Sequence, residues 1–142
     1  MPAQIDLTYT GAMRCTARLI SSGKTLATDL PESQGGLGEG VSPSDLLVVS
    51  LGTCIVTTMA MVAQRHNIDL SGMSACIDKD MTTTPVRRVG PIGVTISMPM
   101  GLHLSPEDMQ RLENAAARCP VKQSLHPDIE VRVEFVYPRE NG

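Results

Sequence analysis

Aromatic residues are the scarcest class in this chain. Its 142 residues include two Tyr, one Phe and no Trp, so aromatic side chains make up 2% of the sequence. Proteins that stack nucleic-acid bases or enclose cationic ligands use several aromatic side chains, so the composition disfavours both functions. The nine methionines must fill core volume that aromatic rings usually fill.

Runs of basic residues are also missing. Twelve Lys and Arg residues stand against fifteen Asp and Glu residues, which gives a formal net charge of -3. Binding to nucleic acid or to an anionic membrane depends on clustered positive charge. We therefore expect no nucleic acid and no membrane among the main partners.

The cysteine pattern is not that of a zinc site or a disulfide framework. Cysteines stand at positions 15, 54, 76 and 119, with no Cys-x-x-Cys motif and no close Cys/His pairing. The N-terminal residues lack the basic segment and apolar run of a signal peptide, which predicts a cytoplasmic protein with reduced thiols. We expect no metal site.

Familiar catalytic motifs are missing as well. Residues 35–42 have the glycine spacing of a P-loop, but Val41 stands where the phosphate-binding lysine belongs. Neither a Gly-x-Ser-x-Gly motif nor a His-Glu-x-x-His motif occurs, and His66, His103 and His126 are scattered. The glycine-rich stretch is predicted to be a flexible connector, and the three histidines are predicted to be structural.

One long uncharged run is present. Residues 46–63 contain no charged residue, which reaches the lower limit for a membrane-spanning helix. Ser, Thr and Gly residues interrupt the run, and its apolar residues point to nearly every side of a helix. We interpret it as a core helix that a sheet covers on one side and another helix or subunit covers on the rest.

The pattern along the chain predicts an α+β fold in a single domain over residues 1–142, in the order βββ-α-ββ-α-α-β. The first thirty residues alternate as an antiparallel meander with a turn at 21–24. Ser42 and Ser105 each precede a proline and an acid, as helix N-caps do. The remaining predicted elements are a helix over 42–66, strands over 69–80 and 91–100, a helix over 105–118, a short helical turn from Pro120 to 126, and a strand over 129–137.

The four cysteines have different local contexts. Cys15 and Cys76 alternate with apolar residues in predicted strands, so both are predicted to be small buried hydrophobic residues. Cys54 lies in the long helix, where a cysteine is usually a packing residue. Cys119 precedes Pro120 at a predicted helix start, where free N–H groups stabilise a thiolate. Their spacing alone leaves open whether Cys54 and Cys119 form a pair.

Two segments of the chain form a recognisable combination. Residues 42–54 are a Ser-Pro-Ser-Asp-Leu helix opening that leads to Cys54, and residues 118–121 hold the Cys119-Pro120 motif. Together they resemble the OsmC/Ohr family of osmotically inducible and organic-hydroperoxide-resistance proteins. The predicted order of elements matches this family along essentially the whole chain. The resemblance implies an intertwined homodimer with a long buried central helix, in which N-terminal strands of both subunits share sheets.

The resemblance also implies a cysteine-based thiol peroxidase that acts in oxidative stress defence. Cys54 would attack an organic hydroperoxide and become a sulfenic acid, and Cys119 would resolve it to a disulfide. An external dithiol, such as a lipoyl protein, would reduce the disulfide. No metal, haem or flavin cofactor is implied.

The sequence departs from the catalytic members at two points. Ser44 stands where they place a glutamate ten residues before the first cysteine, and residues 31–42 contain no basic residue to serve as their arginine. Arg14, Arg18 and Lys24 are the alternative cations. Two other interpretations therefore stay open: a catalytically weak redox-sensing or small-molecule-binding module, and a protein in which both cysteines are packing residues.

Overall fold

The chain forms two compact units. The computed structural model describes residues 2–139, and the boundary between the units falls after Leu47, inside the longest helix. Each unit holds one three-stranded sheet, in the order β1-β2-β3 or β4-β5-β6. This is the α+β fold with the predicted order of elements, whereas a single domain over residues 1–142 stays a prediction.

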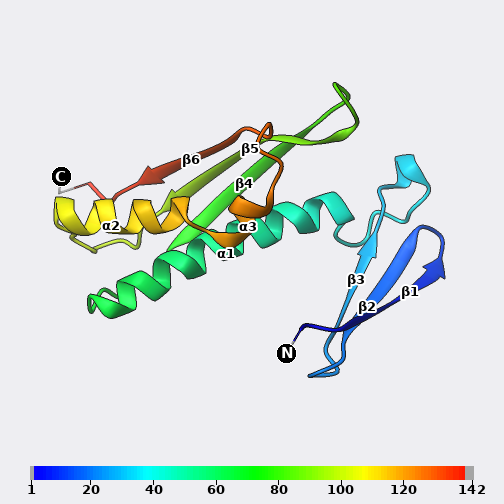
Figure 1. Cartoon of the computed structure of the whole chain (residues 1–142), viewed down its shortest axis with the longest axis horizontal. Helices are drawn as coiled ribbons and strands as arrows, with labels where there is room; N and C mark the ends of the chain where they lie inside the picture. Colours follow the sequence, from blue (N-terminus) through cyan, green and yellow to red (C-terminus); the bar gives the residue numbers. More distant parts are fainter. Residues whose placement is uncertain (1, 140–142) are drawn as a thin grey trace. The chain divides into compact units, whose positions relative to one another are not determined.

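The first unit is built on an antiparallel meander (Figure 1). Its strands are β1 (Ile5–Gly11), β2 (Arg14–Leu19) and β3 (Thr25–Asp29). The chain reverses after β1 at Ala12 and Met13, whose φ angles are 54° and 60°, and after β2 near Gly23, at a φ of 71°. The predicted meander and its turn at 21–24 are confirmed.

The glycine-rich segment after β3 is held in place by one carboxylate. Asp29 is 2% exposed. Its two oxygens accept the backbone N–H groups of Leu37 at 3.0 Å and Glu39 at 2.9 Å. The segment also contains a 3-10 turn, η1 (Glu32–Gln34). A single carboxylate thus satisfies backbone donors eight and ten residues away, which the sequence did not predict; the flexibility of this connector stays a prediction.

Helix α1 (Pro43–Arg65) begins and ends where the sequence predicts. The hydroxyl oxygen of Ser42 accepts the backbone N–H of Asp45 at 3.1 Å, which is the bond an N-cap residue makes. Asn67, at a φ of 56°, adopts the left-handed conformation that stops a helix. The long helix therefore has a defined start and end.

The second unit contains a mixed sheet. Strands β4 (Ser74–Thr82) and β5 (Arg88–Ser97) are antiparallel, and β6 (Val131–Val136) runs parallel to β5. The predicted bounds of 69–80 and 91–100 are wrong by several residues. Met81 pairs with Val89 beyond a register shift, so the two strands stay paired further than predicted. The connection between them is therefore residues 83–87 and not residues 81–90.

Two further helices follow β5 and lie along the sheet together with α1 (Figure 1). Helix α2 (Pro106–Ala117) starts at Ser105, whose hydroxyl accepts the N–H of Asp108 at 3.1 Å. Helix α3 (Pro120–Ser124) is the predicted short turn. The Tyr137 hydroxyl donates a 2.6 Å hydrogen bond to Glu113, which ties α2 to the segment after β6.

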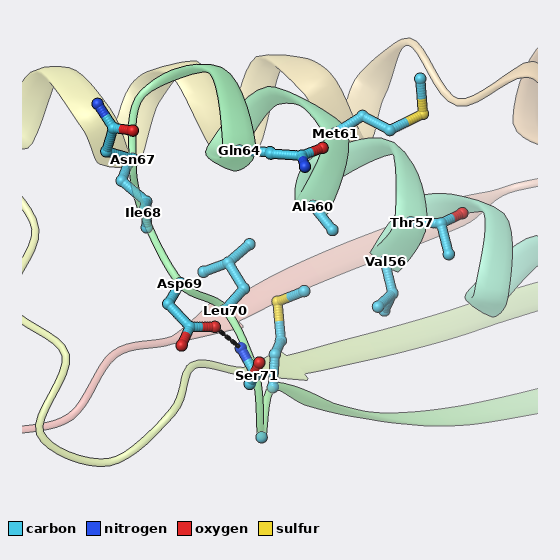
Figure 2. Close-up of a pocket in the computed structure, with 12 residues that line it drawn as sticks. Val56, Thr57, Ala60, Met61, Gln64, Asn67, Ile68, Asp69, Leu70 and Ser71 are labelled. Atoms are coloured by element: carbon cyan, nitrogen blue, oxygen red, sulfur yellow. Dashed lines mark hydrogen bonds between the residues drawn. The ribbon is translucent and has the colours of Figure 1, made fainter.

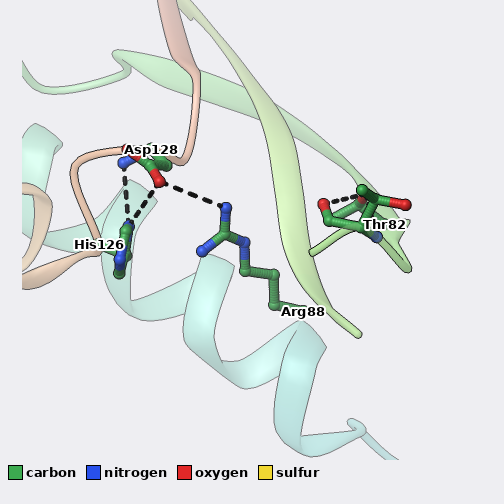
Figure 3. A network of polar contacts seen from close by, with 5 residues as sticks. Thr82, Arg88, His126 and Asp128 are labelled. Carbon is green, nitrogen blue, oxygen red and sulfur yellow. Dashed lines mark hydrogen bonds and ion pairs between the residues drawn. The ribbon is translucent and has the colours of Figure 1, made fainter. Parts of the chain in front are cut away.

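The loop between α3 and β6 is tied to β5 by polar contacts (Figure 3). The Nδ1 atom of His126 accepts the backbone N–H of Asp128 at 3.0 Å, and the Asp128 carboxylate lies 3.9 Å from the Arg88 guanidinium. These contacts shape the loop that leads into β6, and they support the structural role predicted for His126.

One face of α1 forms the core of the second unit. Leu51, Ile55 and Met59 are completely buried, as are Ile92 and Ile96 of β5. The helix is long and apolar enough to cross a membrane by length and composition alone, but this buried face is that of a core helix. Its opposite face is open within one chain: Val49 is 43% exposed and Met61 59% exposed.

Replacing Asp29 tests the carboxylate that organises the glycine-rich segment. The N–H groups of Glu39 and Leu37 hold the pKa of Asp29 below its ordinary value of 3.8. The ionised carboxylate therefore stabilises the fold above the unfolded pKa of about 3.9, and this contribution is lost as pH falls through the lower folded pKa. Urea unfolding midpoints of the wild type and Asp29→Asn should differ most at neutral pH and converge in acid. A difference that is constant with pH would show that the charge of Asp29 is not what stabilises the segment.

Candidate active site

Cys54 lies on α1 about three turns after the helix begins. Its side chain is partly buried. One turn further along the same face, the hydroxyl of Thr58 lies 3.9 Å from the sulfur of Cys54. A hydroxyl at this position can donate a hydrogen bond to a thiolate.

Cys119 occupies the junction between α2 and α3. It is completely buried and stands at the N-cap position of α3, directly before Pro120. Its own backbone N–H donates to the carbonyl of Ala116 at 3.3 Å, which closes the end of α2. The thiol of Cys119 is therefore fixed by the turn that joins the two helices.

The two thiols meet although 65 positions separate them in the sequence. The thiols of Cys54 and Cys119 lie close enough for each to shift the pKa of the other. The backbone N–H of Val121, in the first turn of α3, also lies near Cys54 and helps lower its pKa. The structure thus brings together the two predicted site residues, and it adds Val121, which contributes only backbone atoms and so leaves no signal in the sequence.

The environments of the two thiols shift their pKa values in opposite directions. Burial raises the pKa of Cys54, but hydrogen bonds from the Cys119 thiol, the Val121 N–H and the Thr58 hydroxyl together lower it below its ordinary value of 9.0. Burial raises the pKa of Cys119, and its contact with Cys54 raises it further. The backbone N–H groups of Lys122 and Val121 only partly offset this rise. Cys54 is therefore the cysteine that ionises more readily, and Cys119 is the one that stays protonated and can donate a hydrogen bond.

This result corrects the expectation that the helix start after Cys119 stabilises its thiolate. The helix that follows Cys119 is five residues long, and the thiol is completely buried. Desolvation therefore outweighs the N–H groups that point at it.

The prediction that Cys15 and Cys76 are buried is also wrong. Cys15 is half-buried and Cys76 is exposed. Ile77 packs against α1, where its Cδ1 atom occupies the space that a Cβ atom on Gly52 would need. Since successive residues of a strand face opposite sides, Cys76 must point away from α1. Local alternation in the sequence could not show which side of β4 is covered.

The three cations considered as partners of a thiolate all belong to the first unit. Arg18 lies 3.5 Å from the carboxylate of Asp6, and Arg14 is close enough to Asp29 to help lower the pKa of that carboxyl. At the position of the family's glutamate, the hydroxyl of Ser44 lies 3.4 Å from that of Ser42. In this chain the groups that lower the pKa of Cys54 are hydrogen-bond donors within the second unit.

A large cavity lies further along α1 (Figure 2). It has a volume of about 870 Å³ and lies between the outer side of α1 and the residue 67–73 connection to β4. Val56, Met61 and Met73 give it an apolar wall, and neither thiol of the pair lines it. Within residues 2–139 there is no group of three or more His, Cys, Asp or Glu side chains that could hold a metal ion.

Comparison with known proteins identifies the family of this chain. A sequence profile described as OsmC-like protein matches residues 36–134, which include both thiols. The chain belongs to the OsmC-like protein family. No curated protein sequence matches the chain.

Solved structures of OsmC-like proteins share the fold over nearly the whole chain. A Psychrobacter arcticus protein, described as a candidate osmotic stress induced and detoxification response protein, is 34% identical with a TM-score of 0.85, covering 92% of this chain and 93% of its own. The organic hydroperoxide resistance protein OsmC of Legionella pneumophila is 16% identical with a TM-score of 0.74, covering 96% and 97%. The organic hydroperoxide resistance protein OhrB of Bacillus subtilis is 17% identical with a TM-score of 0.66, covering 95% and 98%.

The opposed pKa shifts predict different alkylation profiles. The rate of Cys54 alkylation by iodoacetamide should reach half its maximum at a lower pH than that of Cys119, because the pKa of Cys54 is lowered and that of Cys119 is raised. Cys119→Ala and Thr58→Val should each move that midpoint upward, since each removes a hydrogen bond to the thiolate. Exposed Cys76 provides an internal reference in the same digest. If neither substitution moves the Cys54 midpoint, the hydrogen bonds do not control its acidity.

Proposed function

We propose that this OsmC-like protein is a thiol-dependent peroxidase that reduces organic hydroperoxides, with Cys54 as the attacking thiolate and Cys119 as the resolving thiol. The observation that carries the proposal is the contact between these two thiols, one with a lowered and one with a raised pKa. A nucleophilic thiolate beside a protonated partner thiol is what the first step of such a reaction needs.

The reaction divides into three balanced steps. The Cys54 thiolate attacks the terminal oxygen of the hydroperoxide, the O–O bond breaks, and the alkoxide takes a proton and leaves as an alcohol. The sulfur of Cys119 then attacks the Cys54 sulfenic acid, which forms a disulfide and releases water. An external dithiol reduces the disulfide by two exchange steps and is itself oxidised to a disulfide.

In this chain neutral hydrogen-bond donors, and not a charged pair, stabilise the Cys54 thiolate. Catalytic members of the family use an arginine and a glutamate, whereas here Ser44 replaces the glutamate. The Thr58 hydroxyl and the Val121 N–H both lower the pKa of Cys54. Neutral donors stabilise a thiolate less than a nearby cation does, so we expect a slower peroxidase than a member with the charged pair.

Names of related proteins support the substrate class. Two of the three solved structures described above are organic hydroperoxide resistance proteins by name. The environment of Cys54 is consistent with this chemistry because its side chain is only partly buried and is therefore accessible to a substrate. On this basis the protein serves in defence against oxidative stress, and it works in the cytoplasm, where dithiol reductants are available.

Peroxide treatment followed by peptide mapping tests the thiol pair. About one equivalent of cumene hydroperoxide should remove about 2 Da from the reduced protein and link Cys54 to Cys119. Cys54→Ser should abolish the link, and Cys119→Ser should leave a sulfenic acid on Cys54 that dimedone traps. Cys76→Ser is the matched control, because it removes an exposed thiol outside the pair.

Two outcomes separate the alternatives. Disulfide formation without sustained peroxide consumption in the presence of dihydrolipoamide would identify a redox-sensing module and not a peroxidase. Cysteines that all stay reduced would mean that Cys54 and Cys119 are packing residues.

We also propose that the active protein is a homodimer, as the family resemblance implies. Ile5, Leu7 and Tyr9 of β1 are 55%, 67% and 61% exposed, and Val49 and Met61 of α1 are open as well. So much exposed apolar surface is typical of an interface. A second copy of the chain would cover these residues and supply the apolar wall that an alkyl hydroperoxide needs beside Cys54.

Light scattering during gel filtration tests the dimer. The wild type should have twice the chain mass of 15.2 kDa. Leu7→Asp should shift the protein toward the monomer, because it places a charge in the proposed interface. Thr8→Asp changes the neighbouring residue on the opposite face of β1 and should leave the mass unchanged. A wild-type mass of one chain would contradict the proposal.

A further inference from the structure

Three arginines and a histidine gather in one small cavity between α1 and α2. The cavity has a volume of about 240 Å³. Its lining residues are Val62, Arg65, His66, Arg111, Asn114 and Arg118. No acidic residue lines it, although the chain as a whole carries more acidic than basic residues.

The positive charge of this cavity is only partly balanced. The Arg111 guanidinium lies 2.7 Å from the Asp108 carboxylate on the same helix. Within the described part of the chain, neither Arg65 nor Arg118 forms an ion pair with a carboxylate. Guanidinium groups stay charged at physiological pH, so the cavity holds two uncompensated positive charges.

Helix ends do not account for the cluster. Arg65 ends α1 and Arg118 follows α2, and a basic residue at such an end interacts favourably with the helix dipole. The carbonyls at these ends already have donors, however: the N–H of His66 bonds to Ala63, and that of Arg118 bonds to Ala115. Moreover, Arg111 lies in the middle of α2 and not at its end.

The polar side chains around the cavity are suited to donate hydrogen bonds. The Oδ1 atom of Asn114 already accepts a 2.9 Å hydrogen bond from the amide of Gln110, which leaves the Asn114 NH₂ group as a donor. Arginine forks match the oxygens of phosphate and carboxylate groups in a bidentate way. A cavity of about 240 Å³ is smaller than the site of a typical organic ligand, which is about 300–1,000 Å³.

We propose that this cavity, the α1–α2 arginine cavity, binds a small multivalent oxyanion, namely a phosphate or phosphate monoester group. Two uncompensated guanidinium groups with neutral donors beside them favour a doubly charged ligand over a monovalent one. The polar side chains that line the cavity are exposed to solvent, so water and salt weaken the attraction. We expect a dissociation constant of about 1 mM or lower.

The cavity does not include the thiol pair. Neither Cys54 nor Cys119 lines it, although Arg118 directly precedes Cys119 in the sequence. Arg65 lies eleven residues beyond Cys54 on α1, which corresponds to about 16 Å along the helix axis. The proposal does not depend on peroxidase activity, and Cys54→Ser should bind the anion as the wild type does.

Isothermal titration calorimetry on the full chain tests the proposal, at a constant ionic strength of about 0.15 M. The probes are inorganic phosphate, phenyl phosphate and acetate. Saturable binding of phosphate or phenyl phosphate at one site per chain, with acetate at least tenfold weaker, is the expected result. Tighter binding of phenyl phosphate would assign the site to a phosphate ester, and tighter binding of inorganic phosphate would assign it to the free ion.

Matched variants locate the bound anion. Arg65→Gln combined with Arg118→Gln should weaken binding at least tenfold, and Arg118→Lys should weaken it less because it keeps the charge but loses the fork. Arg87→Gln is the control, since it removes an exposed arginine outside the cavity. If the double variant does not fold, Arg118→Gln alone should still weaken binding severalfold. No saturable binding, or an equal loss in Arg87→Gln, would overturn the proposal.

Discussion

The close approach of α1 to β4 is the constraint on which the candidate active site depends. Ile77 fills the space in which any residue larger than glycine at position 52 would place its Cβ atom. This contact sets which face of α1 is buried, and it therefore places Cys54 at the border between the core and the open side of the helix. A thiol at such a border is shielded enough to have defined neighbours and open enough to meet a substrate.

The helix boundaries were predictable from the sequence because their signals are local. Ser42 and Ser105 each accept a backbone N–H three residues ahead, and Asn67 ends α1 in a left-handed conformation. The hold of Asp29 on the glycine-rich segment and the orientation of Cys76 were not predictable. Both depend on which groups the rest of the fold brings near, and a pattern of neighbouring residues does not contain that information.

The same distinction applies to the candidate site. The family resemblance pointed to Cys54 and Cys119, and the structure places them in contact. Local reasoning favoured Cys119 as the acidic thiol, because a helix start follows it. The actual order of acidity is set by the complete burial of Cys119 and by hydrogen bonds to Cys54 from Thr58 and Val121, which are contributions from tertiary structure.

The parallel pairing of β5 with β6 has a consequence for how the thiol contact arises. Parallel neighbours require the chain to cross back from one end of the sheet to the other, and α2 and α3 form that crossing. Cys119 lies within the crossing, so its position is defined only when Ile92 has found Val131 and the connection is closed. The lowered pKa of Cys54 therefore depends on a sheet pairing in which its own helix takes no part.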